Sequence, residues 1–563
     1  MGLKNYMTRK RLDKLERDLK MLRDRYNFDA SKAIDLSDVL GLDAFTRRIQ
    51  EYQVWNSGNA VLINYFYNNN GSNNYLNYFW LNAPSNYIKR HCGVPKLISN
   101  KMGTILFGGG FKPIVTVYKT DESGNVTKEK DNNVTENAQE VIDALFEKTK
   151  ILKQFHAQAV KESWCGESFL KFNYDLKLSQ FPIIKAYDLT KAEAIVEKDI
   201  TTAIIFKSWF NKKEDKNNMK KYRYEETYTT DNMGYAVIYN KLYELKTDGK
   251  ENEVPLTTIP ETSNILPEYR FEGLKGMLAF HKPNKLPNNE FPDSVYGASD
   301  YQGATDTFDG LDEVYSEFVA ETRNNKTIRY IPTDMIPQDE SGVPLLNLAK
   351  WITNYQKVTG DQDQGTNSEI QIQEIPDKTA SLAEKYLKYL TNAINLAGLS
   401  PLALGITGLE AINAGETSQK ERNRVTLETR SDKINNYWKP FLKEVTLQLL
   451  NFNNWLVKTA GAKQEGLEVD KVSFENADIT FDFGNYVVEN EDNIITRWAN
   501  AKMGGLSSIE NGVRQIHPDW TDEQILEEVT KIKFENNIGV DDPTLLQMDL
   551  TEEDTFTNGE DIE

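Results

Sequence analysis

The spacing of apolar and polar positions divides this chain into helical, extended and loop segments. Apolar side chains recur every three or four residues, the period of one face of an α-helix, over 40–67, 86–105 and 138–162. Apolar and polar residues alternate between 166 and 282, which favours β-strands at 166–174, 203–210, 221–230 and 234–245. Another strand is expected at 111–119, after a run of three glycines. The first half is therefore predicted to mix helices with antiparallel strands.

Two further helical patterns flank a short insert. The first covers 299–322, with apolar or aromatic residues at Tyr301, Thr305, Phe308, Leu311, Tyr315, Phe318 and Thr322. The insert, 327–376, contains β-like pieces at 327–332 and 369–375. The second helix is predicted to be capped by Asp377 and to end at Gly398 and Pro401. Its expected inward face is Leu382, Tyr386, Tyr389, Leu390, Ala393 and Leu396.

A glycine-containing loop and the longest helical pattern follow. The helix is expected from 416 to 457, with a kink at Pro440. Its apolar seam is Ile434, Trp438, Phe441, Val445, Leu449, Phe452 and Trp455. A strand at 478–483 precedes three shorter helical patterns, at 489–503, 508–516 and 522–536. At the ends of the chain, 8–26 shows a short heptad seam, and 541–563 carries nine acids and no base, which is typical of a flexible tail.

Charge changes the interpretation of the helix at 299–322. It carries seven acids and no base between Asp300 and Thr322, in a chain with 66 basic and 85 acidic residues and a net charge of −19. Such a surface disfavours gripping nucleic acid through its phosphates, which requires Lys and Arg to replace counterions, although it allows nucleic acid to slide past. Hydrophobic residues make up 39% of the chain, so we expect a folded protein with a large core.

The sequence contains little that indicates catalysis. It has no phosphate-binding loop, zinc-protease motif or nucleophile-elbow motif, and its four histidines are scattered. The two cysteines, Cys92 and Cys165, match no metal or redox spacing, so free thiols in a reducing compartment are expected. No apolar run approaches the ~20 residues needed to cross a bilayer, and no secretory signal is present, which favours a cytoplasmic protein. We therefore expect no enzyme activity, no catalytic residue, no cofactor and no metal.

The order of these elements resembles the portal proteins of tailed bacteriophages. The likeness rests on the helix and glycine turn at 86–108, the helix-to-strand step at 163–170, the start of the acidic helix at 297–301, the segments 397–401 and 414–417 before the long helix, and 504–508 with 522–528 near the end. It covers about residues 40–537.

The resemblance implies an α+β portal fold. Its parts would be an N-terminal heptad arm (1–35), the first part of a mixed wing (36–295), a first stem helix (296–326), a small α/β clip (327–376), a second stem helix (377–398), a tunnel loop (399–418), a wing helix with a strand (419–484), a helical crown (485–540) and an acidic tail (541–563).

It also implies a function. Portals form rings, usually of twelve subunits, at one capsid vertex, and double-stranded DNA crosses the ring during packaging and ejection. The implied partners are further copies of the chain, DNA, the terminase large subunit, major capsid and scaffolding proteins, and a head-completion adaptor, with no membrane. The implied location is the virion, after assembly in the host cytoplasm.

The same resemblance assigns roles to particular residues. Contacts of the tunnel loop with DNA would come from Ile406, Thr407, Leu409, Glu410, Ile412 and Asn413, and its hinges would be Gly405, Gly408 and Gly415. The acidic stem face would be Asp306, Asp309, Glu313 and Glu317. This face either lines the channel, faces bulk solvent outside the stem, or pairs with the stem bases Lys385 and Lys388 of the second helix.

Two other classes of function stay open from the sequence. A tail or baseplate component of a virion would assemble with another symmetry and lack a bore of DNA size. An acidic cytoplasmic enzyme is favoured only by the abundance of carboxylates and aromatic side chains.

Overall fold

The computed structural model divides the chain into two compact units, 1–484 and 485–563. The residues that it describes are 42–69, 78–84, 87–120, 126–198, 200–215, 218–246, 251–292, 294–324, 328–332, 354–358, 371–373, 378–406, 423–464, 477–484, 491–517 and 520–535. The predicted heptad arm, most of the tunnel loop and the acidic tail lie outside these ranges. No helix within them is both long and apolar enough to span a bilayer.

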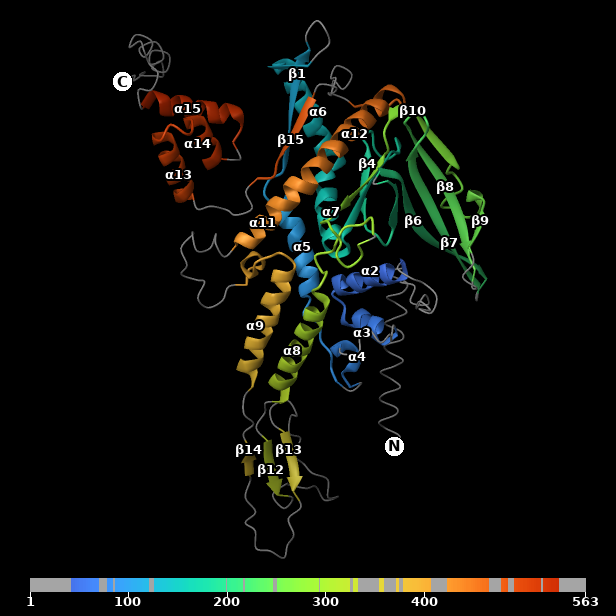
Figure 1. The fold of residues 1–563 in the computed structure, drawn as a ribbon, viewed down its shortest axis with the longest axis vertical. Helices are drawn as coiled ribbons and strands as arrows, with labels where there is room; N and C mark the ends of the chain where they lie inside the picture. The colour runs from blue at the N-terminus through green and yellow to red at the C-terminus, as the bar shows by residue number, and fades with distance from the viewer. Residues whose placement is uncertain are drawn as a thin grey trace, which may run out of the picture. The chain divides into compact units, whose positions relative to one another are not determined.

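The helices in the first part of the described chain (Figure 1) bury several large aromatic side chains, among them Trp55, Trp80 and Phe155. They are α2 (Leu42–Ser57), α3 (Ala60–Asn69), α4 (Phe79–Asn82), α5 (Val94–Phe107), α6 (Asn132–Thr149) and α7 (Ile151–Cys165). The predicted helix at 138–162 is two helices, because Lys150 adopts a left-handed backbone (φ 53°) that interrupts the hydrogen-bond ladder. The predicted helix at 86–105 starts only at Val94, after Gly93 with φ 74°.

In the described part of the first unit, three antiparallel sheets accompany these helices. The largest has strand order β10-β8-β7-β6-β5, with β9 paired to β8, and the others are β11-β3-β4 and β15-β1-β2. The bounds are β1 (Lys112–Thr120), β2 (Val126–Lys130), β3 (Glu167–Asn173), β4 (Ile183–Tyr187), β5 (Ala192–Glu197), β6 (Ile200–Asp215), β7 (Asn218–Thr230), β8 (Tyr235–Leu245), β9 (Glu251–Val254), β10 (Glu268–Lys275), β11 (Ala279–Pro283) and β15 (Ala477–Asp482). The five strands predicted in this region and the strand at 478–483 are confirmed; β2, β4, β5, β9, β10 and β11 were not predicted.

The insert lies between two helices, α8 (Thr305–Asn324) and α9 (Thr379–Leu396), which run side by side (Figure 1). It contains β12 (Ile328–Pro332), β13 (Asn354–Val358) and β14 (Gln371–Gln373), with β12 parallel to β13 and antiparallel to β14. The described part of the insert is thus a small mixed sheet. Its described residues, 328–332, 354–358 and 371–373, include no helix of the expected α/β clip.

Both flanking helices differ from their predicted starts. Residues before Thr305 form turns, so α8 begins six residues later than expected. The N-cap of α9 is Lys378, which makes no side-chain capping hydrogen bond, and Asp377 lies outside the described residues. On α9, Leu382, Leu390 and Ala393 are buried as predicted, but Tyr389 and Leu396 are exposed.

The long helical segment consists of α11 (Arg424–Asp432), a π-helical turn (Lys433–Trp438) and α12 (Lys439–Lys458). All seven residues of the predicted apolar seam are buried. The departure from α-helical hydrogen bonding lies in the π-helical turn just before Pro440, which stands in the first turn of α12. The backbone stays helical across this boundary, since Trp438 has φ −76° and ψ −46°. The kink expected at Pro440 stays a prediction.

The described part of the second unit contains three helices, α13 (Glu491–Met503), α14 (Ile509–Ile516) and α15 (Asp522–Glu535). They match the three patterns predicted near the end of the chain. Val513, Ile525 and Val529 form their shared core.

Candidate functional site

Helices α8 and α9 form the element that the sequence singled out. Their contact includes the rings of Tyr315 and Tyr386, whose centroids lie 5.8 Å apart. Gly310 permits a close approach, because a Cβ at this position would lie 2.9 Å from Cε1 of Tyr389. The pair therefore packs through aromatic side chains, with the smallest possible residue opposite one of them.

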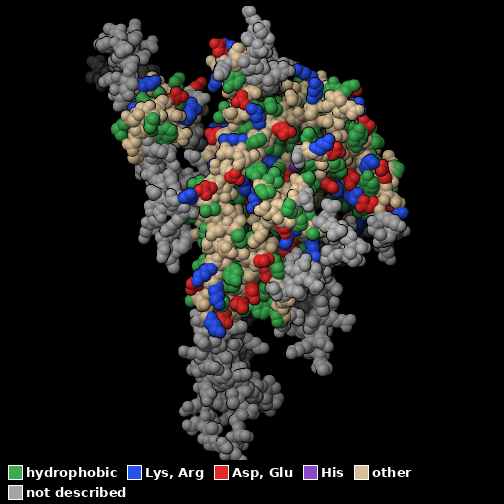
Figure 2. Space-filling model, in the orientation of Figure 1, with side chains coloured by type: hydrophobic (Ala, Val, Ile, Leu, Met, Phe, Trp, Pro, Cys, Tyr) green, Lys and Arg blue, Asp and Glu red, His purple; other side chains and the backbone are tan. Residues whose placement is uncertain are grey.

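The acids of α8 divide into an exposed group and a buried group. Asp306, Glu313 and Glu317 are exposed, and at 100° per residue they lie within about 40° of one another around the helix axis. We call these three residues the acidic stripe. In Figure 2 acidic side chains gather over α8, whereas Lys and Arg side chains gather over the lower part of α9.

Asp309 does not belong to this stripe, which corrects the predicted acidic face. Its side chain is buried (6% exposed) and accepts hydrogen bonds from the backbone N–H groups of Phe79 (2.6 Å) and Trp80 (3.2 Å). These are the first two residues of α4, so Asp309 caps that short helix from a distance in sequence. Burial raises the pKa of Asp309 from 3.8 to about 7, although the two N–H donors lower it. A side chain in this position cannot contact DNA.

This raised pKa predicts a pH-dependent loss of stability. Between about pH 4 and 7 Asp309 is ionised in the unfolded chain but still protonated in the folded one, so the free energy of unfolding falls as the pH rises. At 1.36 kcal/mol per pKa unit, the full effect is about 4 kcal/mol. We expect Asp309→Asn to remove this slope, so that the stability of the variant relative to wild type rises from pH 4 to pH 8. Thermal melts across this pH range measure the stability difference between variant and wild type. The control is Glu140→Gln, which replaces an exposed acid on α6. If stability changes with pH equally in wild type, Asp309→Asn and Glu140→Gln, the raised pKa of Asp309 is contradicted.

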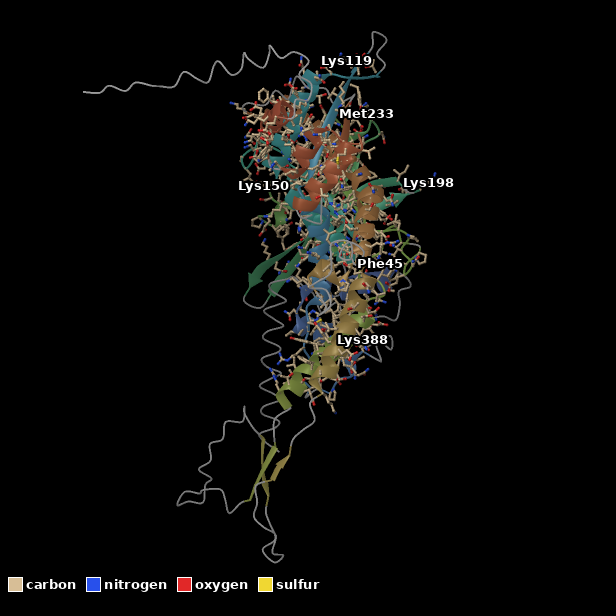
Figure 3. All side chains as sticks on the ribbon, turned by 90° about the vertical axis from the view of Figure 1, so that its left-hand side faces the viewer. Phe45, Lys119, Lys150, Lys198, Met233 and Lys388 are labelled. Atoms are coloured by element: carbon tan, nitrogen blue, oxygen red, sulfur yellow. The ribbon has the colours of Figure 1, made fainter. Side chains whose placement is uncertain are left out.

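The stem bases do not pair with the acids of α8. Lys388 projects from α9 (Figure 3), and its Nζ lies 2.8 Å from Oε1 of Glu384 on the same helix. Among the described residues, no ion pair joins Lys385 or Lys388 to Asp306, Glu313 or Glu317. Asp306 instead accepts a hydrogen bond from the hydroxyl of Tyr78. The stripe therefore faces solvent in the single chain, with its charge unneutralised by α9.

Only the start of the predicted tunnel loop belongs to the described structure. A short 3₁₀ turn, Pro401–Leu404, leads to Gly405, whose φ of 77° is in the left-handed region that favours glycine. Ile406 follows and is half-buried. The remaining predicted contact and hinge residues lie outside the described ranges: Thr407, Gly408, Leu409, Glu410, Ile412, Asn413 and Gly415.

Sequence reasoning missed a buried ionic cluster that joins the helical pair to the rest of the unit. We call Glu162, Lys282, Asp300 and Lys433 the junction cluster; each is at most 3% exposed. Nζ of Lys282 lies 2.7 Å from Glu162, and Nζ of Lys433 lies 2.9 Å from Asp300. Burial acts to raise the pKa of Asp300, but Lys433 and Lys285 outweigh it, and the pKa is lowered.

The junction cluster connects four separate parts of the chain. Glu162 is on α7, Lys282 is on β11, Asp300 precedes α8, and Lys433 is on the π-helical turn. Backbone contacts add to it, because Gly166 (φ 86°) lies so close to Gly297 that a Cβ at residue 166 would be 2.4 Å from the carbonyl oxygen of Gly297. These contacts hold the residues that lead into α8 against α7, β11 and the π-helical turn.

The π-helical turn has a structural role in this cluster. Lys433 binds Asp300, and Nε1 of Trp438 donates to Glu162 (3.1 Å). Residues five apart on an α-helix would point about 140° away from each other. The wider π-helical turn, with its i→i+5 hydrogen bonds, brings both side chains to the same buried site. Such turns have no simple sequence signature, which explains why the pattern predicted a continuous helix.

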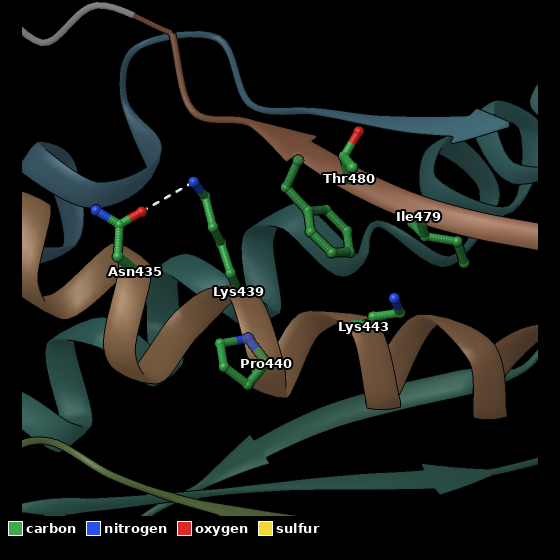
Figure 4. A pocket seen from close by; sticks show the side chains of 7 residues that line it. Asn435, Lys439, Pro440, Lys443, Ile479 and Thr480 are labelled. Atoms are coloured by element: carbon green, nitrogen blue, oxygen red, sulfur yellow. Dashed lines mark hydrogen bonds between the residues drawn. The ribbon is translucent and has the colours of Figure 1, made fainter.

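Two further features could bind a ligand. A groove of about 280 Å³ lies between α12 and β15 (Figure 4), lined by Asn435, Lys439, Pro440, Lys443, Ile479, Thr480 and Phe481. Both of its lysines are already engaged, Lys439 with Asn435 (2.9 Å) and Lys443 with Asp478 (2.7 Å). Of the residues that the structure describes, one group has the donors for a metal ion: His91, Cys92 and Asp312.

No family model matches the chain. No curated protein matches it either. Among solved structures, a chain described as the neck of a native GTA particle computed with C12 symmetry is similar to this one, with a TM-score of 0.34 and 11% identity over 75% of this chain and 89% of that chain. A superposition this loose does not establish a shared function.

Proposed function

We propose that this chain is a portal subunit, which forms a ring at one vertex of a phage capsid and gives double-stranded DNA a passage into and out of the particle. One observation carries the proposal. The chain leaves a mixed α/β body along α8, forms the small β12–β14 sheet, and returns along α9 to the long helix and β15. This is the order of stem, clip, stem and wing that the resemblance implies.

The charge of α8 supports a passage for DNA. In a ring every exposed residue is repeated around the axis, so the acidic stripe becomes a band of negative charge. B-DNA carries one negative charge per ~1.7 Å of its axis, and a basic wall would hold it through counterion release. An acidic wall repels the phosphates and lets the duplex move. We assign the stripe to the channel wall on this ground.

The other parts take their roles from the same proposal. The tunnel loop, 399–418, would contact the moving duplex, and the β12–β14 sheet would dock the terminase during packaging and an adaptor protein afterwards. The wing would contact the capsid and scaffolding proteins. Translocation would be driven by the ATPase of the terminase, and the portal itself would hydrolyse nothing.

The proposal predicts a ring. Purified protein should give annular particles with a central hole in negative-stain microscopy, a mass of many copies in mass photometry, and no ATP hydrolysis. Closed rings are expected because identical head-to-tail contacts close when the rotation between neighbours divides a full turn. A protein that stays monomeric at every concentration and salt tested, or that assembles without a hole, would overturn the assignment.

A further inference from the structure

His91 and Cys92 lie against the middle of α8, although more than 200 residues separate them from it in sequence. Nδ1 of His91 is 2.7 Å from Oδ2 of Asp312, and the backbone N–H of Cys92 donates to Oδ1 of the same carboxylate (2.9 Å). One imidazole nitrogen, the Cys92 Sγ and one Asp312 oxygen all lie within 4.8 Å of one another. A nitrogen, a sulfur and an oxygen donor therefore converge at one point.

The charges at this point are not balanced as they are in the junction cluster. Asp312 is fully buried, and it also accepts a hydrogen bond from the neutral Nε1–H of Trp80 (3.1 Å). Its ion-pair partner among the described residues is His91, whereas the equally buried Asp300 has a lysine. A buried carboxylate without a full positive charge beside it is costly.

The imidazole of His91 is also incompletely satisfied. Its side chain is 3% exposed, yet Nε2 has no hydrogen-bond partner among the described residues.

We propose that His91, Cys92 and Asp312 bind a divalent cation of the Zn²⁺ type. Thiolate, imidazole and carboxylate are the ligands that zinc prefers, at bond lengths of about 2.0–2.3 Å, and a water molecule can occupy a fourth position. Nδ1 of a neutral imidazole would bind the cation with the ring proton on Nε2, and the thiol proton of Cys92 would be released to solvent. The Trp80 Nε1–H then orients the carboxylate from outside, as outer partners of metal ligands commonly do.

Such an ion would fasten the segment before α5 to α8. That segment already contacts α8 through Arg90, whose N–H donates to Oγ of Ser316 (2.9 Å). Because metal–ligand bonds form only in the folded chain, binding should stabilise the first unit. The inference does not depend on ring formation, so it can be tested on protein of any oligomeric state.

Cobalt titration tests the site directly. Full-length protein freed of metal with a chelator is titrated with Co²⁺, and the absorbance is followed for thiolate-to-cobalt charge transfer in the near ultraviolet and for the visible bands of a tetrahedral ion. We expect both signals to saturate at one ion per chain, and Zn²⁺ to displace the cobalt and raise the melting temperature. Absence of charge transfer in the wild-type protein would overturn the proposal.

The second cysteine provides a matched control. Cys165 is buried on α7, and its Sγ donates to the Glu167 carbonyl. Cys92→Ser should abolish charge transfer and the zinc-dependent rise in melting temperature, Cys165→Ser should keep both, and His91→Gln should weaken Co²⁺ binding at least tenfold. Circular dichroism establishes that each variant is folded. Equal binding by Cys92→Ser and wild type, or loss of the band in Cys165→Ser only, would place the metal elsewhere and refute the assignment.

Discussion

Reversing two charges of the acidic stripe should make the ring retain double-stranded DNA that the wild-type ring releases. Glu313→Lys combined with Glu317→Lys puts two lysines per subunit on the exposed side of α8, and a ring repeats them around the axis. Six to ten new phosphate contacts would give binding that falls about 10³–10⁵-fold between 50 and 200 mM salt. A salt series of DNA retention by purified rings measures this effect, and packaging in an infected host should fail.

The control is another pair of acids with the same spacing. Glu136 and Glu140 are exposed on α6, four residues apart, so Glu136→Lys with Glu140→Lys changes the net charge by the same amount away from α8. This variant should package DNA normally. If reversing the stripe abolishes rings, the stripe is a contact between subunits; if it leaves rings and packaging unchanged, it faces bulk solvent. Either result would contradict its assignment to the channel wall.

Replacing Lys433 with methionine should strongly destabilise the first unit. The substitution leaves Asp300, which is 1% exposed, without its main countercharge, because Lys285 is farther away at 3.9 Å. Breaking one side of a buried ion pair costs about 3–5 kcal/mol. Urea unfolding followed by tryptophan fluorescence measures the loss, since Trp438 belongs to the same site.

Two variants separate the lost charge from the lost side chain. Lys439→Met changes an exposed lysine of the same helical segment and should cost less than about 1 kcal/mol. Adding Asp300→Asn to Lys433→Met removes the unpaired charge and should recover part of the stability. If Lys433→Met lowers the free energy of unfolding no more than Lys439→Met does, the junction cluster does not stabilise the first unit.

Several local patterns predicted the structure correctly because their cause is local. The seam from Ile434 to Trp455 is buried, since a three-to-four spacing places these side chains on one side of any helix. The strand at 477–482 and the three final helices follow from similar periodicities. In each case the spacing of apolar residues within the segment is enough to predict the helix or strand.

The acidic helix shows where periodicity fails. Counting acids predicted one charged face, yet Asp309 and Asp312 are buried and only Asp306, Glu313 and Glu317 are exposed. The helix is covered by α9 and also by the segment that contains Phe79, Trp80 and His91. A polar residue can be buried wherever a distant donor meets it, and the sequence around that residue does not contain the donor.

By itself, the sequence of this protein determined its α+β class, most of its helices and longer strands, the apolar seam of the long helix, and the excess of acids on α8. Only the tertiary structure decided where α5 and α8 begin, which acids are exposed, why the long helix contains a π-helical turn, and which side chains meet in the junction cluster and at the proposed metal site. The physical reason is the range of the interactions. Helical and strand periodicity acts between residues a few positions apart, whereas Asp300 with Lys433 and Asp312 with His91 depend on contacts across 133 and 221 positions.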